Sequence, residues 1–382
     1  MPRYLAAKAV EHAAHLDWAR RQLALFREQN LPHLKLLDRL DAQLAEDAQT
    51  LRQIEISIGL PGMRWVAEKA CYTLHASLRD LSENYIAGLL QQGPEELRWR
   101  ELLLDAAHRI GLTWIHDILV RLDRDLSIIP SHHRDHSIPI FFAPPSQHQS
   151  VLSLPGIFHE FGHCVVSRFR AIAFSLKKTV AHHFEAERLK LGPMLPAQRK
   201  GRLQQIDDAA AFWTEHRLVE IFCDVFATYT CGCVNILSMV DLARASAMDP
   251  HSVEYDYPPH ATRIAASLHA LDPQQQKSVT VAEIWGDWQK MAQILPTTNE
   301  YHAYCPVALV EKLAACSVEL IGVHLPATTR NTALPYNIDD ALAQPVSADL
   351  RASTAAGLAI LWHSPQQFHV WKAGFRNVLG FE

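Results

Sequence analysis

Three ionisable side chains lie close together in the otherwise apolar segment "LPGIFHEFGHCVVSRF", residues 154–169. Burying such groups without partners costs several kcal/mol, and a bound metal ion would remove that cost. His159 and His163 are four residues apart, so on a helix both imidazoles lie on one face and can bind one ion. Glu160 is turned about 100° from His159 around the helix and can reach a water on that ion. The HExxH pattern therefore predicts a zinc site with two histidine ligands and Glu160 as the general base.

A third protein ligand is expected downstream, in "TEHRLVEIFCDVFATYTCG", residues 214–232. This run is apolar on nearly all sides, which predicts a buried helix. Glu220 and Asp224 are four residues apart on it, and buried acids need partners. We predict Glu220 as the third zinc ligand and Asp224 as the acceptor of the free imidazole N–H of a ligand histidine. The alternative is that both acids pair with Arg or Lys where two helices pack.

The two segments together resemble a known group of enzymes. "HEFGH" followed by "EIFCD" is similar to the gluzincin metallopeptidases, whose pattern is HExxH and then ExxxD on a second helix. The resemblance implies zinc as the cofactor and Glu160 as the catalytic base. It also implies that the zinc ligands are His159, His163 and Glu220. Asp224 would hydrogen-bond a ligand without binding the zinc itself.

A further segment, "YDYPPHATRIAASL" at residues 255–268, is similar to the HPxxxxR stretch of the HtpX-like branch of that group. Tyr257 stands where the branch has histidine, and Arg263 aligns with its arginine. The resemblance implies that these two residues polarise the scissile carbonyl and hold the oxyanion. The alternative is a helix start, with Pro258 and Pro259 near the first turn and Arg263 on the surface. The likeness covers residues 138–270, and the membrane helices of that branch have no counterpart in this chain.

Apolar spacing and helix-breaking residues divide the chain into elements that must position these side chains. Residues 1–130 are expected to form an antiparallel helical bundle, with helices over 4–29, 33–57, 64–92 and 95–125. Residues 131–382 are expected to form a zincin-like metallopeptidase domain with a helical C-terminal extension. Its helices are predicted over 203–230, 234–246, 259–271, 280–294, 306–324 and 347–362. The fold class is therefore mainly α, with an N-terminal helical bundle and a small β-sheet in the zincin-like core.

Two short segments, 137–145 and 149–155, are β-prone and flanked by Pro and Ser, and they predict the strands of that sheet. The strand "SVLSL", residues 150–154, comes just before the HExxH helix. In the peptidases that the chain resembles, an edge strand above the zinc pairs with an extended substrate. The expected substrate is thus a peptide or an unfolded protein segment.

The composition narrows the class of protein. Hydrophobic residues make up 48% of the 382 residues, which indicates a globular chain, and the net charge of -5 argues against a nucleic-acid-coating surface. No secretory signal and no membrane span is expected, because charges interrupt every long apolar run. The seven cysteines show no framework spacing and favour a reducing compartment, so the expected location is cytoplasmic, with no nucleic-acid or membrane partner.

The sequence leaves three functions open. The first is a zinc metallopeptidase, an endopeptidase in which Glu160 activates a zinc-bound water. The second is a zinc amidohydrolase or deacylase acting on a small substrate, which a narrow pocket would favour. The third is a catalytically silent, zinc-containing regulatory scaffold. The intact Glu160 argues against the third, because a purely structural zinc site has no use for a base and is usually closed by a fourth protein ligand.

Overall fold

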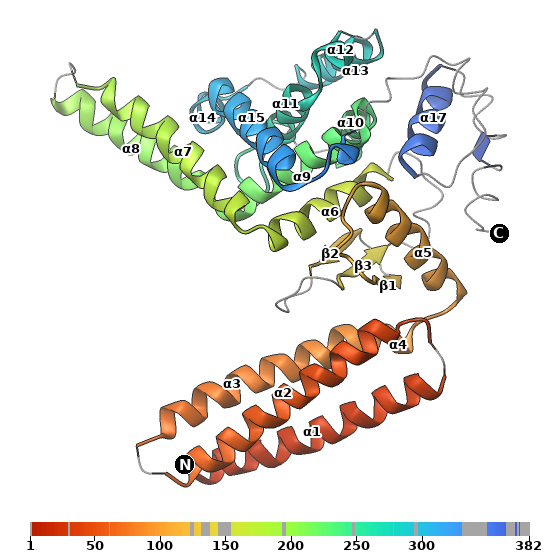
Figure 1. Cartoon of the computed structure of the whole chain (residues 1–382). Helices are drawn as coiled ribbons and strands as arrows, with labels where there is room; N and C mark the ends of the chain where they lie inside the picture. The colour runs from red at the N-terminus through yellow and green to blue at the C-terminus, as the bar shows by residue number, and fades with distance from the viewer. Residues whose placement is uncertain are drawn as a thin grey trace.

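In the computed structural model the chain folds into two groups of helices with one small sheet between them (Figure 1). The structure describes residues 2–29, 31–60, 62–122, 126–130, 138–143, 154–192, 196–246, 249–277, 279–293, 297–330, 350–363, 371–372 and 374. Within these residues the fold is mainly helical with a small sheet, as predicted, and the sheet has three strands. No helix in the described part of the chain is long and apolar enough to cross a membrane.

The N-terminal helices form an antiparallel bundle, drawn in red and orange at the bottom of Figure 1. It consists of α1 (Pro2–Glu28), α2 (Leu34–Ile58) and α3 (Arg64–Asp80). Six apolar residues at spacings of three, four and seven predict the second helix. Five of them are buried in the bundle core, Leu37, Leu40, Leu44, Leu51 and Ile54, and the last, Ile58, is half-buried. The predicted third helix continues past α3 through a π-helical turn, Leu81–Ile86, into α4 (Ala87–Leu90).

The sheet lies between two hydrophobic cores. Its strands are β1 (Leu119–Leu122), β2 (Ser127–Ile129) and β3 (Ile140–Ala143), in the order β1-β3-β2. Leu119 and Ile140 are paired and pack into the bundle core, whereas the next pair, Val120 and Phe141, packs into the second core. Because successive side chains of a strand point to opposite faces, this alternation fixes one face of the sheet against each core.

The predicted helix over 95–125 is wrong beyond its first four turns. Helix α5 (Pro94–Arg109) ends in a turn in which Gly111 has a φ of 86°, a conformation that favours glycine. The backbone N–H of Gly111 donates to His108 O, and that of Leu112 to Ala107 O, a Schellman arrangement that closes the helix. The apolar run that follows is buried, and its last part forms β1.

The second core is built on helices that pack around α9 (Glu215–Cys231), and α6 (Pro155–Arg168) is one of its main neighbours. The predicted helix over 203–230 is instead two helices. Helix α8 (Pro196–Phe212) ends before Thr214, whose hydroxyl accepts the backbone N–H of Arg217 and so caps α9. Helices α7 (Ala171–Leu189) and α8 form a hairpin that projects from this core on the left of Figure 1.

The helices predicted over 234–246, 259–271, 280–294, 306–324 and 347–362 are confirmed to within a few residues. Helix α10 (Cys233–Ser246) and helix α11 (His260–Ala270) pack on each other and on α9, and α15 (Val307–His324) covers both α9 and α11. The others that the structure describes are α12 (Pro273–Gln276), α13 (Val279–Ala292), α14 (Asn299–Tyr304), a 3-10 turn η4 (Ala327–Thr329) and α17 (Leu350–His363). The strand predicted at 137–145 is confirmed as β3, and the strand at 149–155 falls almost wholly outside the described residues.

Helices α6 and α9 approach closely at Gly162, where a Cβ atom would lie 2.9 Å from the Cα of Cys223. We therefore expect Gly162→Ala to lower the free energy of unfolding by about 1–3 kcal/mol, because the two backbones must separate. Gly201→Ala on α8 is the matched control, since nothing lies within 4 Å of its Cβ position. That variant should gain up to ~1 kcal/mol from helix propensity alone. Both values come from denaturant unfolding, and equal effects at the two sites would contradict the close approach.

Candidate metal centre

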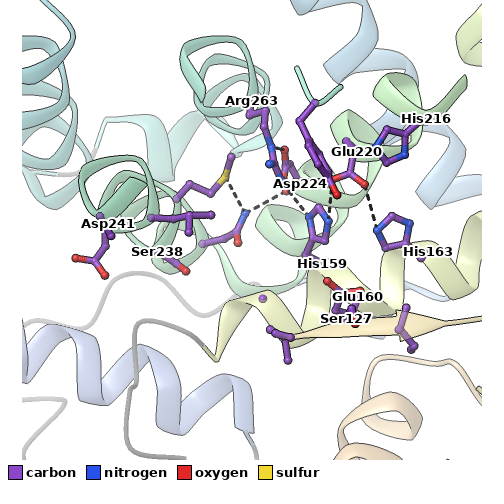
Figure 2. A pocket seen from close by; sticks show the side chains of 18 of the residues that line it. Ser127, His159, Glu160, His163, His216, Glu220, Asp224, Ser238, Asp241 and Arg263 are labelled. Carbon is purple, nitrogen blue, oxygen red and sulfur yellow. Dashed lines mark hydrogen bonds and ion pairs between the residues drawn. The ribbon is translucent and has the colours of Figure 1, made fainter. Parts of the chain in front are cut away.

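The predicted ligands come together where α6 and α9 cross (Figure 2). His159 and His163 lie one turn apart on α6, with their ring centroids 5.2 Å apart, and Glu220 faces them from α9. All three side chains line one pocket. The close contact at Gly162 lets the two helices approach near enough for this.

The Glu220 carboxylate faces the outer nitrogen of each imidazole. His159 Nε2 lies 3.3 Å from Glu220 Oε2, and His163 Nε2 lies 3.5 Å from Glu220 Oε1. Ligand atoms around a tetrahedral zinc ion, each bound at 2.0–2.1 Å, are about 3.3–3.5 Å apart. Each imidazole nitrogen therefore lies as far from a Glu220 oxygen as two ligands of one tetrahedral ion lie from each other, so these three side chains could hold a metal.

Cys223 is a second candidate for the third donor. Its sulfur and the donor nitrogens of His159 and His163 all lie within 4.8 Å of one another. However, Cys223 is fully buried against Gly162, burial raises the pKa of its thiol well above the usual range, and it does not line the pocket. A cysteine binds zinc as a thiolate, which burial disfavours here, whereas the Glu220 carboxylate has a lowered pKa and faces the pocket. The donor set His159, His163 and Glu220 is therefore the better one.

Asp224 fixes the orientation of His159. Its Oδ1 lies 2.9 Å from His159 Nδ1 and accepts that N–H, which directs the Nε2 atom into the pocket. Burial alone would lower the pKa of His159, but the carboxylates of Asp224 and Glu220 raise it to about 10. Burial, together with the charge on His159, lowers the pKa of His163 to about 4. A positive charge is thus favoured between His159 and Glu220, and a divalent cation can take the place of that proton.

Arg263, on α11, forms ion pairs with the carboxylates of both Asp224 and Glu220. Its Nε donates to Asp224 Oδ2 at 2.6 Å, its Nη2 donates to Asp224 Oδ1 at 2.8 Å, and Nη2 lies 3.6 Å from Glu220. Burial alone would raise the pKa of Asp224, but this guanidinium holds it well below its usual range. The backbone carbonyl of Asp224 also accepts from Thr228 and Asn235. Asp224 therefore sits in a rigid network that links α9, α10, α11 and the His159 ring.

Glu160 points into the pocket beside the two histidines (Figure 2). Burial is the main reason that its pKa is raised to about 7, and the backbone of Ile128 in β2 hydrogen-bonds its carboxylate. A carboxylate with this pKa can both accept and return a proton near neutral pH. The predicted base is thus next to the candidate metal ligands and is held by the edge strand of the sheet.

The pocket has a volume of about 660 Å³ and is lined by α6, α9, α10 and the segment around β2. Among the described strands, the edge strand beside the HExxH helix is β2, which the sequence had not singled out. Tyr257 and Arg263 both line the pocket, and Arg263 is engaged by the two acids. Tyr257 is 52% exposed and contacts the ring of His216 edge-on, with centroids 4.9 Å apart. The role of these two residues as oxyanion donors stays a prediction.

His216 is a pocket residue that the sequence reasoning missed. It lies in the first turn of α9, four residues before Glu220, and Figure 2 shows it on the same side of the pocket as His163. The four-residue spacing to Glu220 was the available signal, because it places both side chains on one face of the helix. His216 joins Tyr257 at the exposed rim of the site.

No protein-family model, curated protein or solved structure matches this chain. The chemistry of the site is therefore argued from its own geometry.

Asp224→Asn is expected to weaken zinc binding by about 10–100-fold, because the amide no longer presents a charged acceptor to the His159 ring. Competition with a chromophoric chelator measures the affinity. The control is Asp207→Asn, which removes an exposed carboxylate paired with Arg188 and should leave the affinity unchanged. Equal zinc affinity in wild type and Asp224→Asn would show that Asp224 has no part in positioning the ligand.

Proposed function

We propose that this protein is a zinc-dependent metallopeptidase. The observation that carries the proposal is the Glu220 carboxylate facing both His159 Nε2 and His163 Nε2 at 3.3 and 3.5 Å, with Glu160 beside them. Two imidazoles, one carboxylate and a nearby free acid are the parts of a catalytic zinc site. A structural site is instead closed by four protein ligands.

The residues present suit amide hydrolysis. A zinc ion held by His159, His163 and Glu220 would lower the pKa of its water toward ~7. Glu160 lines the pocket beside the two histidines, so it is placed to take the proton from the attacking water and to deliver it to the leaving amine. His216 and Tyr257 at the rim, and Arg263 within the pocket, are the available donors for the developing oxyanion.

The edge strand favours a peptide as substrate. β2 pairs only with β3 among the described strands, and Ser127 and Ile128 line the pocket beside Glu160. An extended peptide laid along the outer edge of β2 would add a strand to the sheet, with its backbone next to the metal ligands. None of the seven cysteines forms a disulfide, which suits the reducing cytoplasm that we propose as the protein's location.

The rival functions remain distinguishable by assay. A volume of about 660 Å³ also suits a small amide substrate, which would make the protein a deacylase. The purified, zinc-loaded protein should cleave unstructured peptides, lose that activity in chelator and regain it when zinc is restored. Hydrolysis of acetylated amines without peptide cleavage would favour the deacylase. A zinc-loaded protein that hydrolyses neither class would favour the silent scaffold.

A further inference from the structure

The pocket extends beyond the metal centre along one face of α10. The residues of this second half are spaced three, four and seven apart, so they share one side of the helix: Asn235, Ser238, Asp241, Leu242 and Ala245. Figure 2 shows Ser238 and Asp241 on the opposite side of the pocket from His163 and His216. The pocket is thus elongated, with the metal ligands at one end and Asp241 at the other.

The distance between the two ends suits a short peptide. Asn235 is anchored at the metal end, since its Nδ2 donates to the Asp224 carbonyl at 3.2 Å. Asp241 follows six residues later, which is about 9 Å along the helix axis. An extended peptide covers that length in about three residues. A side chain near Asp241 therefore belongs to a residue within about three positions of the reacting bond.

The described lining of the pocket offers no basic partner for the carboxylate of Asp241. Four carboxylates line the pocket, and the described lining contains one arginine and no lysine. That arginine, Arg263, is engaged by Asp224 and Glu220. Among the residues that the structure describes, none forms a hydrogen bond or ion pair with Asp241. Its exposed carboxylate can accept a cation from a ligand.

The walls next to Asp241 are apolar. Leu242 and Ala245 follow it on α10 and Met239 precedes it; Leu126, the residue before β2, also lines the pocket. An aliphatic stem that ends in a positive charge fits an apolar wall with an acid at its end, and this describes lysine and arginine.

We propose that the pocket selects peptides with a lysine or arginine within three residues of the scissile bond, with Asp241 pairing with the cationic head. The stem of that side chain lies along Met239 and Leu242. This inference rests on the proposed function and names its substrate class: basic, unstructured peptides.

Two pools of synthetic peptides test the proposal, identical except that norleucine replaces every lysine and arginine in the second pool. Zinc-loaded, full-length wild type should cleave the basic pool faster by about tenfold in kcat/KM, the size of one charge-assisted hydrogen bond. Mass spectrometry of the products should place lysine or arginine at one fixed position within three residues of the cut. Equal cleavage of the two pools would overturn the proposal while leaving the metallopeptidase function standing.

Variants of Asp241 test whether this residue causes the preference for basic peptides. Asp241→Asn should bring the ratio between the pools close to one, and Asp241→Lys should favour a third pool with glutamate at the basic positions. A defect in folding would slow all pools equally and would not reverse the preference. Asp208→Asn on α8 removes an acid that does not line the pocket, and it should keep the wild-type ratio. An unchanged ratio in Asp241→Asn would overturn the proposal.

Affinity measurements test the role of Asp241 independently of the proposed peptidase activity, because they need no cleavage. The zinc-loaded Glu160→Gln protein is expected to cleave too slowly to consume the probes, so fluorescence anisotropy can compare its affinity for the labelled basic and norleucine pools. Tighter binding of the basic pool by about tenfold, lost on adding Asp241→Asn, supports selection by Asp241 even if wild type cleaves no peptide. Equal affinity for the two pools overturns it.

Discussion

Glu160→Gln is expected to slow peptide hydrolysis by about 10²–10⁴-fold while leaving the metal in place. The amide has nearly the shape of the carboxylate but cannot accept the proton of the attacking water. Glu160 lines the pocket next to the histidines without taking part in their contacts with Glu220, so the donor set stays intact. Initial rates on peptide substrates, with zinc content measured on the same samples, test this directly.

Glu185→Gln provides the control for Glu160→Gln. Glu185 is an exposed acid on α7 whose carboxylate pairs with Arg188 away from the pocket, and its removal should leave the rate unchanged. Full activity in Glu160→Gln would exclude this residue as the base. Loss of zinc along with activity would instead make Glu160 a part of the metal site.

Arg263→Met is expected to lower the free energy of unfolding by about 3–5 kcal/mol, because it leaves the charge of Asp224 buried without its main partner. The side chain of Asp224 is 2% exposed and that of Arg263 is 13% exposed, so solvent screens this pair little. Methionine keeps much of the apolar volume of the arginine stem, so the loss reflects the charge. Denaturant unfolding of the metal-free proteins measures it.

A double variant separates the ion pair from general damage to the fold. Arg263→Met combined with Asp224→Asn should lose less stability than the sum of the single variants, with a coupling energy of about 0.5–3 kcal/mol. The exposed pair of Arg188 and Asp207 is the control, and Arg188→Met should cost no more than ~1 kcal/mol. Strictly additive effects of Arg263→Met and Asp224→Asn would contradict the network described for α9 and α11.

Most helices, and the residues that meet at the candidate metal centre, could be predicted from the sequence because both depend on local spacing. Leucines at three, four and seven residues define the buried face of α2, and they are buried as expected. His159 and His163 share a face for the same reason. The meeting of Glu220 with these histidines depends on how two helices cross, and its prediction came from the chemical need for a third donor.

The errors arose where distant parts of the chain decide the structure. The segment after Gly111 is as apolar as a buried helix. It forms β1 instead, because it pairs with β3 some twenty residues further along the chain. Periodicity alone does not separate a short buried strand from a buried helix. The break at Thr214 was missed because the apolar pattern continues on both sides of it, although the threonine is itself a good helix cap.

The role of β2 could not be predicted because three residues carry too short a pattern. Ser127–Ile129 becomes the edge strand through its antiparallel pairing with β3, which places Ile128 against Glu160. The far end of the pocket was missed for another reason. Asp241 was one acid among 41 acidic residues, and only the packing of α10 beside α6 shows that it shares a pocket with the histidines.

The central claim is that His159, His163 and Glu220 bind one metal ion, and metal content measured by mass spectrometry on purified protein tests it most directly. The account predicts about one zinc per chain in wild type, in Glu160→Gln and in Cys223→Ala, and much less in Glu220→Ala. Loss of zinc in Cys223→Ala but not in Glu220→Ala would show that the thiol is the third ligand. A folded wild-type protein that has never met a chelator and holds no metal would contradict the account.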